Sequence, residues 1–537
     1  MYFTSNNKNM KKQVFISVVF VVFVIFFSVN YKTETNNRTF MIYMNGSDLE
    51  SENKVASKDL KEICKSNLSE NTTVLIYTGG TKNWHNKDID SERNQIFEVK
   101  NGRLKLLKSL GKKSMGSSET LSEFVDYSMN NRKSDENILI FWNHGGGAIS
   151  GFGKDENFNN DTLVLSEIEI GIKKGLGKSG DKIDMVVFDA CLMSSFETAY
   201  SLRNYCDYMV ASEELVPGYG FDYKKIIDRS LHMDIKRLGK FFVDSFYKES
   251  ERKGKDKIIT MSLLDLKEIE NLYNNFMERL SYVGGYYNFD SLKEKVSLGP
   301  VFGGRTKEEG FSNMVDFYSL SLSIFGEKDI GAIKEDLNDV VVYTRNGYLN
   351  REACGLSIFF PLNYNDKTLY ELNLYNYISM NSNYYKFLES YKYFERNKKH
   401  EDIYKVKNVK NKNIIYEIIK DKKEDKKNNR IFYLNGNILS VYKIASVNNL
   451  DIYTAPIILN GKEASLRFCV NKLKGNTQII GTVSARGKLN ISEEKILDLH
   501  ENDILKIINY EIMDDGEIKR VLSDEIKVTG ETSVLQM

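Results

Sequence analysis

A histidine and a cysteine stand just beyond two apolar runs that are expected to form buried strands. His144 comes after the run Asn137–Trp142 and precedes three glycines, and Cys191 comes after the run Ile183–Phe188. The glycines carry no Cβ atom, so this backbone can approach a ligand closely. A thiolate with an imidazole in reach can perform acyl transfer: Cys191 would attack a carbonyl carbon, and His144 would hold or deliver the proton for the leaving amine.

Backbone N–H groups would complete this candidate site. We expect those of Gly145 and Cys191 to stabilise the oxyanion that forms when the carbonyl is attacked. Cys191 is also expected to open a helix, whose terminal N–H groups and dipole lower the pKa of a thiol. Rival motifs fail, because the sequence has no G-x-S-x-G nucleophile elbow, no HExxH and no CxxC pair.

The elements that must position these residues alternate between buried strands and helices. Further apolar runs lie at Arg38–Met44, Thr73–Thr78 and Tyr208–Ala211, with later ones at Ile258–Leu264 and Leu356–Phe360 that we expect in the same sheet. Near-continuously hydrophobic strands separated by helices predict an α/β fold with a mostly parallel sheet sandwiched by helices. Such sheets carry their sites at the carboxyl ends of the strands, where His144 and Cys191 both fall.

Length and charge set broader limits. The 537 residues are too many for one compact core, and 75 Lys+Arg against 74 Asp+Glu leave a net charge of +1. That balance argues against a nucleic-acid binder, which usually has a strong basic excess. Five cysteines are too few for a disulfide scaffold.

The chain is expected to have four parts. In residues 1–34, three lysines precede the apolar run Val14–Val29, which is typical of a secretion signal or a membrane anchor. Because no small-x-small cleavage site follows, a retained anchor is slightly favoured, and the lysines place the remainder outside the cytoplasm. Residues 35–395 would form the catalytic domain and 396–430 a charged linker. Residues 431–537, with turn signals such as Asn460-Gly461, would form a small antiparallel β domain.

Two motifs resemble those of a known family. The stretches Phe141–Gly147 (FWNHGGG) and Phe188–Met193 (FDACLM) resemble the clostripain family of cysteine peptidases, family C11, which has a caspase-like fold. Weaker matches at Met41–Gly46, Tyr77–Gly80, Ala211–Glu214, Pro217–Tyr223 and Gly355–Pro361 extend the resemblance over residues 39–393. The resemblance implies that His144 and Cys191 are the catalytic dyad. It also implies that Asp189 lies at the base of an S1 pocket selecting Arg or Lys at P1, which suits the charge-assisted hydrogen bonds of a carboxylate.

The sequence does not decide the cleft wall, the site of processing or the need for calcium. Ser212, Glu213 and Tyr219 leave the next strand at the same rim and are candidates for a wall of the substrate cleft. Family members are often cut after a basic residue between the two motifs, where Lys154, Lys173, Lys174 and Lys178 lie. The chemistry itself requires no cofactor. Calcium is a candidate through the resemblance alone, with Asp155, Glu156, Asp161 and Asp222 in suitable loops but with no metal ligand assigned.

The sequence leaves three functions in competition. The resemblance favours an endopeptidase, expected as a monomer, that acts on protein or peptide substrates after Arg or Lys and is processed by itself. The alternatives are a catalytically inactive surface binding protein on the same fold, and a cysteine amidase or transpeptidase acting on cell-wall peptides. Intact His144, Cys191 and Asp189 count against the inactive protein. We expect no nucleic-acid partner, and membrane contact only through an uncleaved N-terminal segment.

Overall fold

A computed structural model describes most of the chain downstream of the N-terminal segment. The described residues are 37–131, 134–177, 181–283, 288–305, 309–375, 378, 382–405 and 432–536, the last range with gaps at 436, 440, 448–449, 472–475, 485–495, 498, 513–517, 531 and 533. The expected signal or anchor at 1–34 and most of the expected linker at 396–430 lie outside them. Within these ranges, no helix has the length and apolarity needed to cross a membrane.

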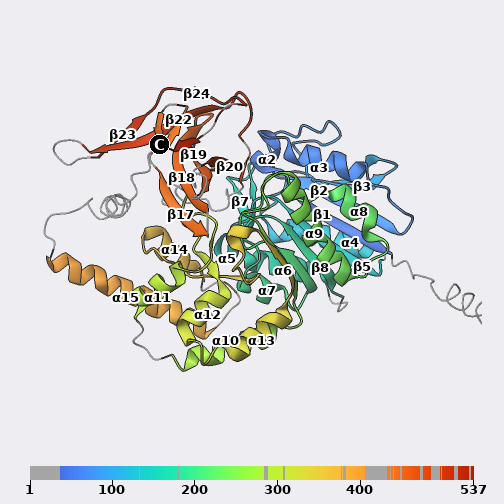
Figure 1. Ribbon diagram of the computed structural model, residues 1–537. Helices are drawn as coiled ribbons and strands as arrows, with labels where there is room; N and C mark the ends of the chain where they lie inside the picture. Colours follow the sequence, from blue (N-terminus) through green and yellow to red (C-terminus); the bar gives the residue numbers. More distant parts are fainter. Residues whose placement is uncertain are drawn as a thin grey trace, which may run out of the picture.

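A nine-stranded sheet forms the centre of the larger part of the molecule (Figure 1). Its strand order is β13-β10-β9-β8-β5-β1-β2-β3-β4. In chain order the strands are β1 Arg38–Asn45, β2 Thr72–Gly79, β3 Gln95–Lys100, β4 Arg103–Ser109, β5 Glu136–Trp142, β8 Ile183–Asp189, β9 Cys206–Ala211, β10 Thr260–Asp265 and β13 Val341–Asn346. The five central strands, β9-β8-β5-β1-β2 in sheet order, pair in parallel. The strands β3 and β4 at one edge and β10 and β13 at the other are added in antiparallel pairs.

Helices cover both faces of this sheet, as expected for parallel strands that are apolar on both sides. One layer contains α3 (Val55–Cys64), α8 (Tyr223–Ser230) and α9 (Ile235–Arg252). The other contains α4 (Ser118–Asn131), α6 (Leu165–Leu176) and α7 (Phe196–Leu202), and α10 (Ile269–Ser281) and α13 (Gly331–Val340) extend it. The expected α/β architecture is therefore confirmed.

The larger part contains further elements around the carboxyl edge and one end of the sheet. They are α2 Ser47–Ser51, α5 Gly147–Ser150, β6 Phe152–Asp155, β7 Asp161–Leu163, α11 Phe289–Ser297, β11 Val301–Phe302, β12 Met314–Asp316, α12 Phe317–Phe325, the 3-10 turn η1 Tyr348–Asn350, β14 Ser357–Phe359, α14 Asp366–Tyr375 and α15 Asn383–Lys405. Because α15 runs to Lys405, the first residues of the segment expected as a linker are helical.

One strand expectation is wrong. The run Leu356–Phe360 does form a strand, β14, but it belongs to a separate three-stranded sheet with the order β11-β12-β14. Apolar content predicted a buried strand there, yet it could not say which neighbour would accept its hydrogen bonds. Ser357 connects this strand to the segment after β8, because its N–H group donates to the carbonyl oxygen of Ser194 at 2.8 Å.

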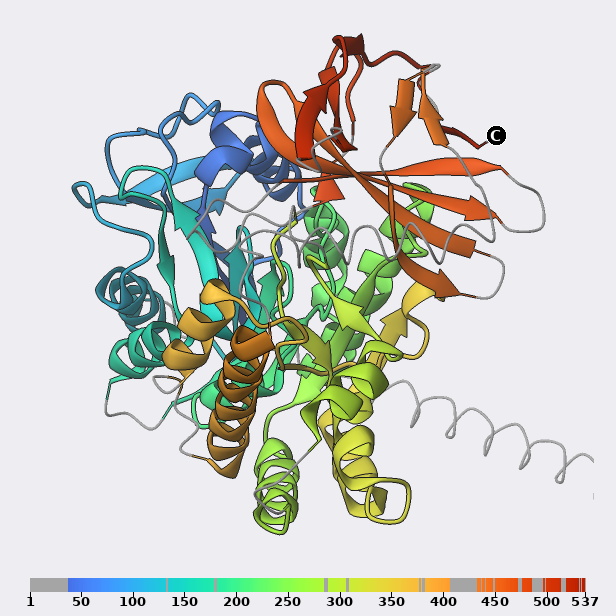
Figure 2. The same ribbon diagram turned by 90° about the vertical axis from the view of Figure 1, so that its left-hand side faces the viewer.

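The last hundred residues form the antiparallel β domain that the turn signals predict (Figure 2). Its strands are β15 Phe432–Leu434, β16 Asn437–Leu439, β17 Tyr442–Val447, β18 Leu450–Leu459, β19 Lys462–Asn471, β20 Thr477–Ser484, β21 Ile496–Leu497, β22 Ile504–Ile512, β23 Ile518–Leu522, β24 Ile526–Lys527 and β25 Val534–Gln536. The domain has its own core around Phe432, Tyr453 and Phe468. Ile452 and Val483 pack instead with the core of the larger part, so the two parts share a buried boundary.

Candidate active site

Strand register brings the histidine and the cysteine together. β5 and β8 run in parallel with Trp142 opposite Asp189, so His144 and Cys191 each lie two residues beyond the same register pair. The N–H group of Asn143 continues the ladder by donating to the carbonyl oxygen of Asp189 at 3.4 Å. Both loops therefore leave the sheet side by side at its carboxyl edge, as the sequence indicated.

Gly145 is the point where the two loops touch. A Cβ atom at this position would lie 2.0 Å from the carbonyl oxygen of Cys191 and 2.8 Å from its nitrogen, so only glycine fits. Gly145 also forms an antiparallel bridge with Phe152. The two hydrogen bonds of this bridge come from the N–H groups of Gly146 and Gly153, and the N–H group of Gly145 takes no part in them. In such a pair the N–H group of Gly145 points away from Phe152, which suits its expected role as an oxyanion donor.

The surroundings of Cys191 differ from the expectation in one respect. The helix after the cysteine, α7, begins only at Phe196, with Ser195 as its N-cap, because Leu192 turns the chain through a left-handed conformation at φ +64°. Cys191 therefore does not open a helix, and the helix-terminal N–H groups are not at its sulfur. One N–H group takes their place: Val216 donates to the Cys191 Sγ atom at 3.1 Å.

His144 is held by a carboxylate that belongs to neither of the two motifs. Its Nε2 atom lies 3.0 Å from Oδ1 of Asp48, on the short helix α2 that follows β1. A carboxylate accepts a hydrogen bond from Nε2–H, which leaves Nδ1 as the basic nitrogen of the neutral ring. Nδ1 is buried and has no hydrogen-bond partner among the described residues. The imidazole is thus oriented, with one basic nitrogen available for proton transfer.

The charge on Asp48 is maintained by its neighbours. Burial alone would raise the pKa of Asp48, but the charge and hydrogen bond of His144, together with Lys154, hold it well below the usual range. The Lys154 Nζ atom lies 3.9 Å from Oδ1 of Asp48. An anionic Asp48 stabilises a protonated His144, the form that delivers a proton to a leaving group.

A signal for Asp48 was present in the sequence. The stretch Gly46-Ser47-Asp48 follows Asn45, the last residue of β1, so it is a third polar loop at the same edge of the sheet. Asn143 ties this loop to the histidine loop, because its Nδ2 atom donates to the carbonyl oxygen of Asn45 and to the Ser47 Oγ atom. What the sequence could not supply is the strand order, in which β1 lies next to β5.

Asp189 is fully buried at the end of β8. The hydroxyl group of Tyr223 donates to its Oδ2 atom at 2.8 Å. Gly220 passes directly over the carboxylate with φ +56°, and a Cβ atom there would lie 2.5 Å from Oδ2. The carboxylate at the end of β8 is therefore covered by the loop that follows the neighbouring strand, β9.

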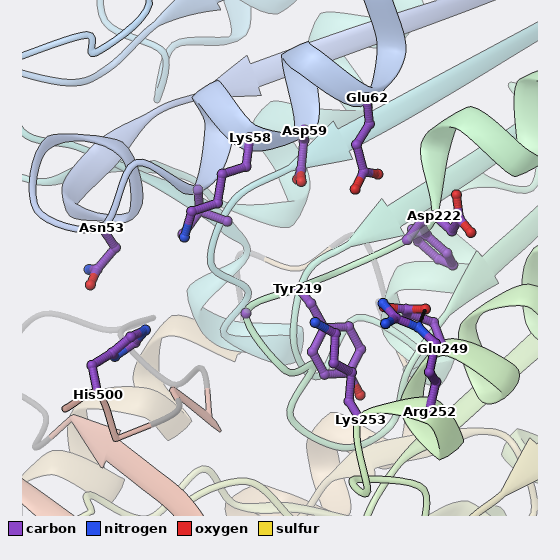
Figure 3. A pocket seen from close by; sticks show the side chains of 13 residues that line it. Asn53, Lys58, Asp59, Glu62, Tyr219, Asp222, Glu249, Arg252, Lys253 and His500 are labelled. Atoms are coloured by element: carbon purple, nitrogen blue, oxygen red, sulfur yellow. Dashed lines mark hydrogen bonds and ion pairs between the residues drawn. The ribbon is translucent and has the colours of Figure 1, made fainter. Parts of the chain in front are cut away.

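A pocket of about 400 Å³ lies on the outer side of the same loop (Figure 3). Its wall consists of residues from α3, from the loop Gly218–Asp222, from the end of α9 and, in the β domain, His500. The acidic side chains Glu62, Asp222 and Glu249 converge there: burial and then the charges of Asp222 and Glu249 raise the pKa of Glu62. Neither His144 nor Cys191 lines this pocket.

The three residues named for a cleft wall separate into two groups. Tyr219 lines the pocket, whereas Ser212 and Glu213 are fully buried behind the loop. The Ser212 hydroxyl group hydrogen-bonds with Thr260 at 3.0 Å. Burial raises the pKa of Glu213 well above its usual range, with the charge of Asp316 adding to the effect.

The four acidic residues named for calcium do not form a shared ligand set. Asp155 accepts N–H groups from Met115 and Asn157, Glu156 accepts that of Lys82, Asp161 accepts the Ser114 hydroxyl group, and Asp222 caps α8. Over the described residues, one group of three potential metal ligands lies within 4.8 Å of one another: Glu213, Asp316 and Cys354. Two of these already bond to each other, because the Cys354 N–H group donates to Asp316 Oδ2 at 2.7 Å. No calcium site follows from these residues.

The lysines named for processing also differ in their positions. Lys173 and Lys174 lie within α6, where a protease would have to unwind helix, and Lys178 lies outside the described residues. Lys154 lies in β6, beside the carboxylate that orients His144. It is therefore the candidate nearest to the site.

This geometry defines a class: a caspase-like α/β fold whose sheet edge carries a cysteine, an oriented histidine and an open glycine backbone. The chain belongs to the clostripain family, whose family model matches residues 42–456, more than three quarters of its length. The resemblance seen in the two motifs is thereby confirmed.

The chain is also similar to a curated relative and to solved structures. Clostripain from Hathewaya histolytica is 35% identical over 133 residues, which span 21% of this chain and 24% of clostripain, so the alignment covers about a quarter of that relative. The structure of an inactive zymogen C11 protease from Parabacteroides distasonis matches with a TM-score of 0.51 at 20% identity, over 64% of this chain and 97% of that one. A secreted C11 cysteine protease from Bacteroides thetaiotaomicron, in complex with an irreversible peptide inhibitor, gives a TM-score of 0.49 at 16% identity, over 64% and 99% of the two chains.

Proposed function

We propose that the chain is a cysteine endopeptidase that hydrolyses peptide bonds after Arg or Lys. The observation that carries the proposal is the alignment of Asp48, His144 and Cys191 at three neighbouring strand ends, with Asp48 bonded to His144 at 3.0 Å. An inactive binding protein would have no physical need for a partly exposed carboxylate that orients a buried imidazole.

The mechanism uses side chains and backbone N–H groups of this chain. His144 takes the thiol proton of Cys191 at Nδ1 while its Nε2–H bond to Asp48 persists, and the sulfur attacks the carbonyl carbon of the peptide. The N–H groups of Gly145 and Cys191 donate hydrogen bonds to the developing oxyanion. His144 then protonates the leaving amine, and a thioester joins Cys191 to the new carboxyl end of the substrate.

Hydrolysis of the thioester completes the cycle. His144 removes a proton from water as the oxygen attacks the thioester carbon, and the C–S bond breaks to release the acid. The proton returns to the sulfur through His144. Each step leaves the Asp48 carboxylate charged, which keeps the imidazole in one tautomer.

The preference for basic residues rests on Asp189. Its carboxylate lies two residues before the nucleophile. The pocket beside the covering loop has acidic side chains, Glu62, Asp222 and Glu249, together with the basic side chains Lys58, Arg252 and Lys253. Because Asp189 is fully buried under Gly220, the proposal requires the loop Pro217–Asp222 to shift when a substrate binds. Glycines at 218 and 220 give that loop the backbone freedom to do so.

Location and processing are part of the same proposal. The apolar run Val14–Val29 with lysines before it supports a position outside the cytoplasm, either anchored or released. Cleavage between the two motifs, with Lys154 as first candidate, would release the contact of this lysine with Asp48. Mass spectrometry of the purified protein would identify the new end.

Peptide reporters test the activity. Purified residues 35–537 are expected to cleave reporters ending in Arg or Lys and to spare those ending in Ala, and Cys191→Ala should abolish cleavage. Asp189→Asn should weaken cleavage after Arg and Lys selectively. A requirement for an added amine acceptor would point to a transpeptidase. If no reporter is cut and Cys191 also resists alkylation at neutral pH, the peptidase proposal is wrong.

A further inference from the structure

The C-terminal β domain is attached to the catalytic part through a buried ion pair. Arg467, on β19, places its Nε atom 3.0 Å from Oε1 of Glu309, and the two side chains are only 6% and 0% exposed. Thr454, on β18, donates its hydroxyl group to the same oxygen at 2.9 Å. The Arg467 guanidinium group also donates to the carbonyl oxygen of Gly303 at 3.1 Å. The domain thus holds both ends of the segment from Gly303 to Glu309.

Glu309 is connected, through Arg305, to a second ion pair. The second oxygen of Glu309, Oε2, accepts the backbone N–H group of Arg305 at 3.0 Å. The Arg305 side chain in turn lies 3.1 Å from Oε2 of Glu214, which is almost fully buried. Oε1 of Glu214 accepts the N–H group of Gly303 at 2.9 Å. Positive and negative groups therefore alternate from the β domain to the loop after β9.

Glu214 is adjacent to the groups that hold the nucleophile. Its carbonyl oxygen accepts the N–H group of Leu192 at 3.3 Å, and its carboxylate accepts the N–H group of Leu215 at 2.9 Å. The next N–H group along the chain, that of Val216, donates to the Cys191 sulfur at 3.1 Å. A displacement of Glu214 would therefore move two groups: Val216, whose N–H group donates to the sulfur, and Leu192, which follows Cys191.

The chemistry of this connection favours a positioning role over simple attachment. Apolar contacts alone can hold two domains together, and a buried ion pair contributes little net stability because both ions lose their hydration. Charge-assisted hydrogen bonds with two contacts on each side do fix geometry. Four charged residues, Arg467, Glu309, Arg305 and Glu214, connect the β domain to the loop that contacts the thiol. Such a series can fix the position of the thiol.

We propose that Arg467 is a positioning residue for peptide hydrolysis: docking of the C-terminal β domain fixes the Cys191 sulfur through Glu309, Arg305 and Glu214. This inference rests on the proposed function for its turnover readout, but the reactivity of the thiol tests it separately. The β domain would then be a working part of the active site rather than an appendage.

The experiment compares variants of the full chain. Arg467→Gln removes the charge, Arg467→Lys restores it without the second hydrogen bond, and Lys462→Ala is the matched control. Lys462 also joins the β domain to the larger part, through Glu52, but these side chains are 69% and 48% exposed and have no link to Glu214. The readouts are kcat and KM on an Arg reporter, the rate of iodoacetamide reaction at Cys191 across pH, and the thermal unfolding temperature.

We expect Arg467→Gln to lower kcat and the alkylation rate by at least about tenfold with KM changed by less than about threefold, because misplacement of reacting groups acts on the chemical step. Arg467→Lys should lie between this variant and the wild type, and Lys462→Ala should match the wild type. A folded Arg467→Gln protein with wild-type alkylation and kcat would overturn the inference. So would a gain of activity, since the domain would then be an inhibitor.

A double substitution separates positioning from folding. Arg467→Met together with Glu309→Met removes both charges and leaves no uncompensated buried ion, so stability should recover. The positioning role predicts that kcat and alkylation stay low in this variant, whereas their recovery along with stability would overturn it. If even the wild type cuts no reporter, the proposed function fails, and the alkylation rates alone still decide this inference.

Discussion

The Asp48 carboxylate oxygen lies 3.0 Å from the His144 Nε2 atom, so the histidine at the centre of the site is oriented by a residue from a different strand end. Three loops, after β1, β5 and β8, meet at this point. The chemistry therefore depends on the order of strands in the sheet as much as on the two motifs.

Asp48→Asn should lower kcat by about 10²-fold to 10⁴-fold, because an amide can favour the wrong imidazole tautomer and cannot stabilise the imidazolium ion. KM should change little, since Asp48 has no contact with the substrate in the mechanism. Steady-state kinetics on an Arg reporter measures both constants. Glu52→Gln, an exposed acid just beyond the same short helix, is the control and should retain wild-type kinetics. Equal activity of Asp48→Asn and wild type would rule out the orienting role.

Gly145→Ala should abolish most activity. The added methyl group would meet the Cys191 carbonyl oxygen at 2.0 Å, which forces the histidine and cysteine loops apart. We expect a loss of at least about 10²-fold in kcat/KM and about 1–3 kcal/mol in the free energy of unfolding. Gly331→Ala, at an exposed helix start with nothing within 4 Å of the new methyl group, should change neither. An active Gly145→Ala enzyme would contradict the close packing of the two loops.

Tyr223→Phe removes one donor from the Asp189 carboxylate. A buried acceptor that loses a hydrogen bond destabilises the protein, and we expect a decrease of about 1–3 kcal/mol in the free energy of unfolding. If Asp189 binds the P1 side chain, this variant should keep its preference for Arg and Lys, since the carboxyl group of Asp189 is unchanged. Asp189→Asn should lose that preference. Urea unfolding and reporter kinetics measure the two effects, and loss of the preference in Tyr223→Phe would argue that the tyrosine itself selects the substrate.

Glu197 should make stability depend on pH. Burial raises the pKa of Glu197 to about 7 from 4.5, although the Phe359 N–H group and the Tyr375 hydroxyl group oppose the shift. The folded protein therefore binds this proton more tightly than the unfolded chain. The stabilisation is complete below pH 4.5 and is lost as the pH rises through about 7, on the order of 3 kcal/mol in total.

Glu197→Gln should flatten that part of the stability profile. Chemical denaturation at several pH values between 4.5 and 7.5 measures the difference between the variant and the wild type, and Glu213, whose pKa is raised in the same direction, is present in both. Glu352→Gln, an exposed acid with a side chain 70% exposed, should leave the profile unchanged. Parallel profiles for Glu197→Gln and wild type would refute the raised pKa.

The sequence predicted the central strands and the residues at their ends because both signals are local. A buried parallel strand is apolar along its whole length, as in β5, and the polar residues after it stand out. Asp48 was missed because its importance depends on β1 being the neighbour of β5, which no local pattern encodes. The position of Cys191 relative to its helix was wrong for a related reason: the left-handed turn at Leu192 has no glycine to announce it.

The β domain illustrates the same limit. Turn signals such as Asn460-Gly461 predicted its antiparallel strands, and both residues do have positive φ. The role of Arg467 could not be predicted, because its partner Glu309 lies far away in the sequence and neither stands in a recognisable motif. Contacts between distant segments are fixed by packing, and composition does not report them.

The pairing of β5 with β8 has a physical consequence for a cut chain. His144 and Cys191 lie just beyond two strands that are neighbours in the sheet, while the connection between them runs through α6, which packs against α4. A single break in that connection would sever the polypeptide without separating the two strands. The products should appear as two bands in a denaturing gel and as one particle in native electrophoresis. The cut protein would then be an enzyme of two subunits that were made as one chain.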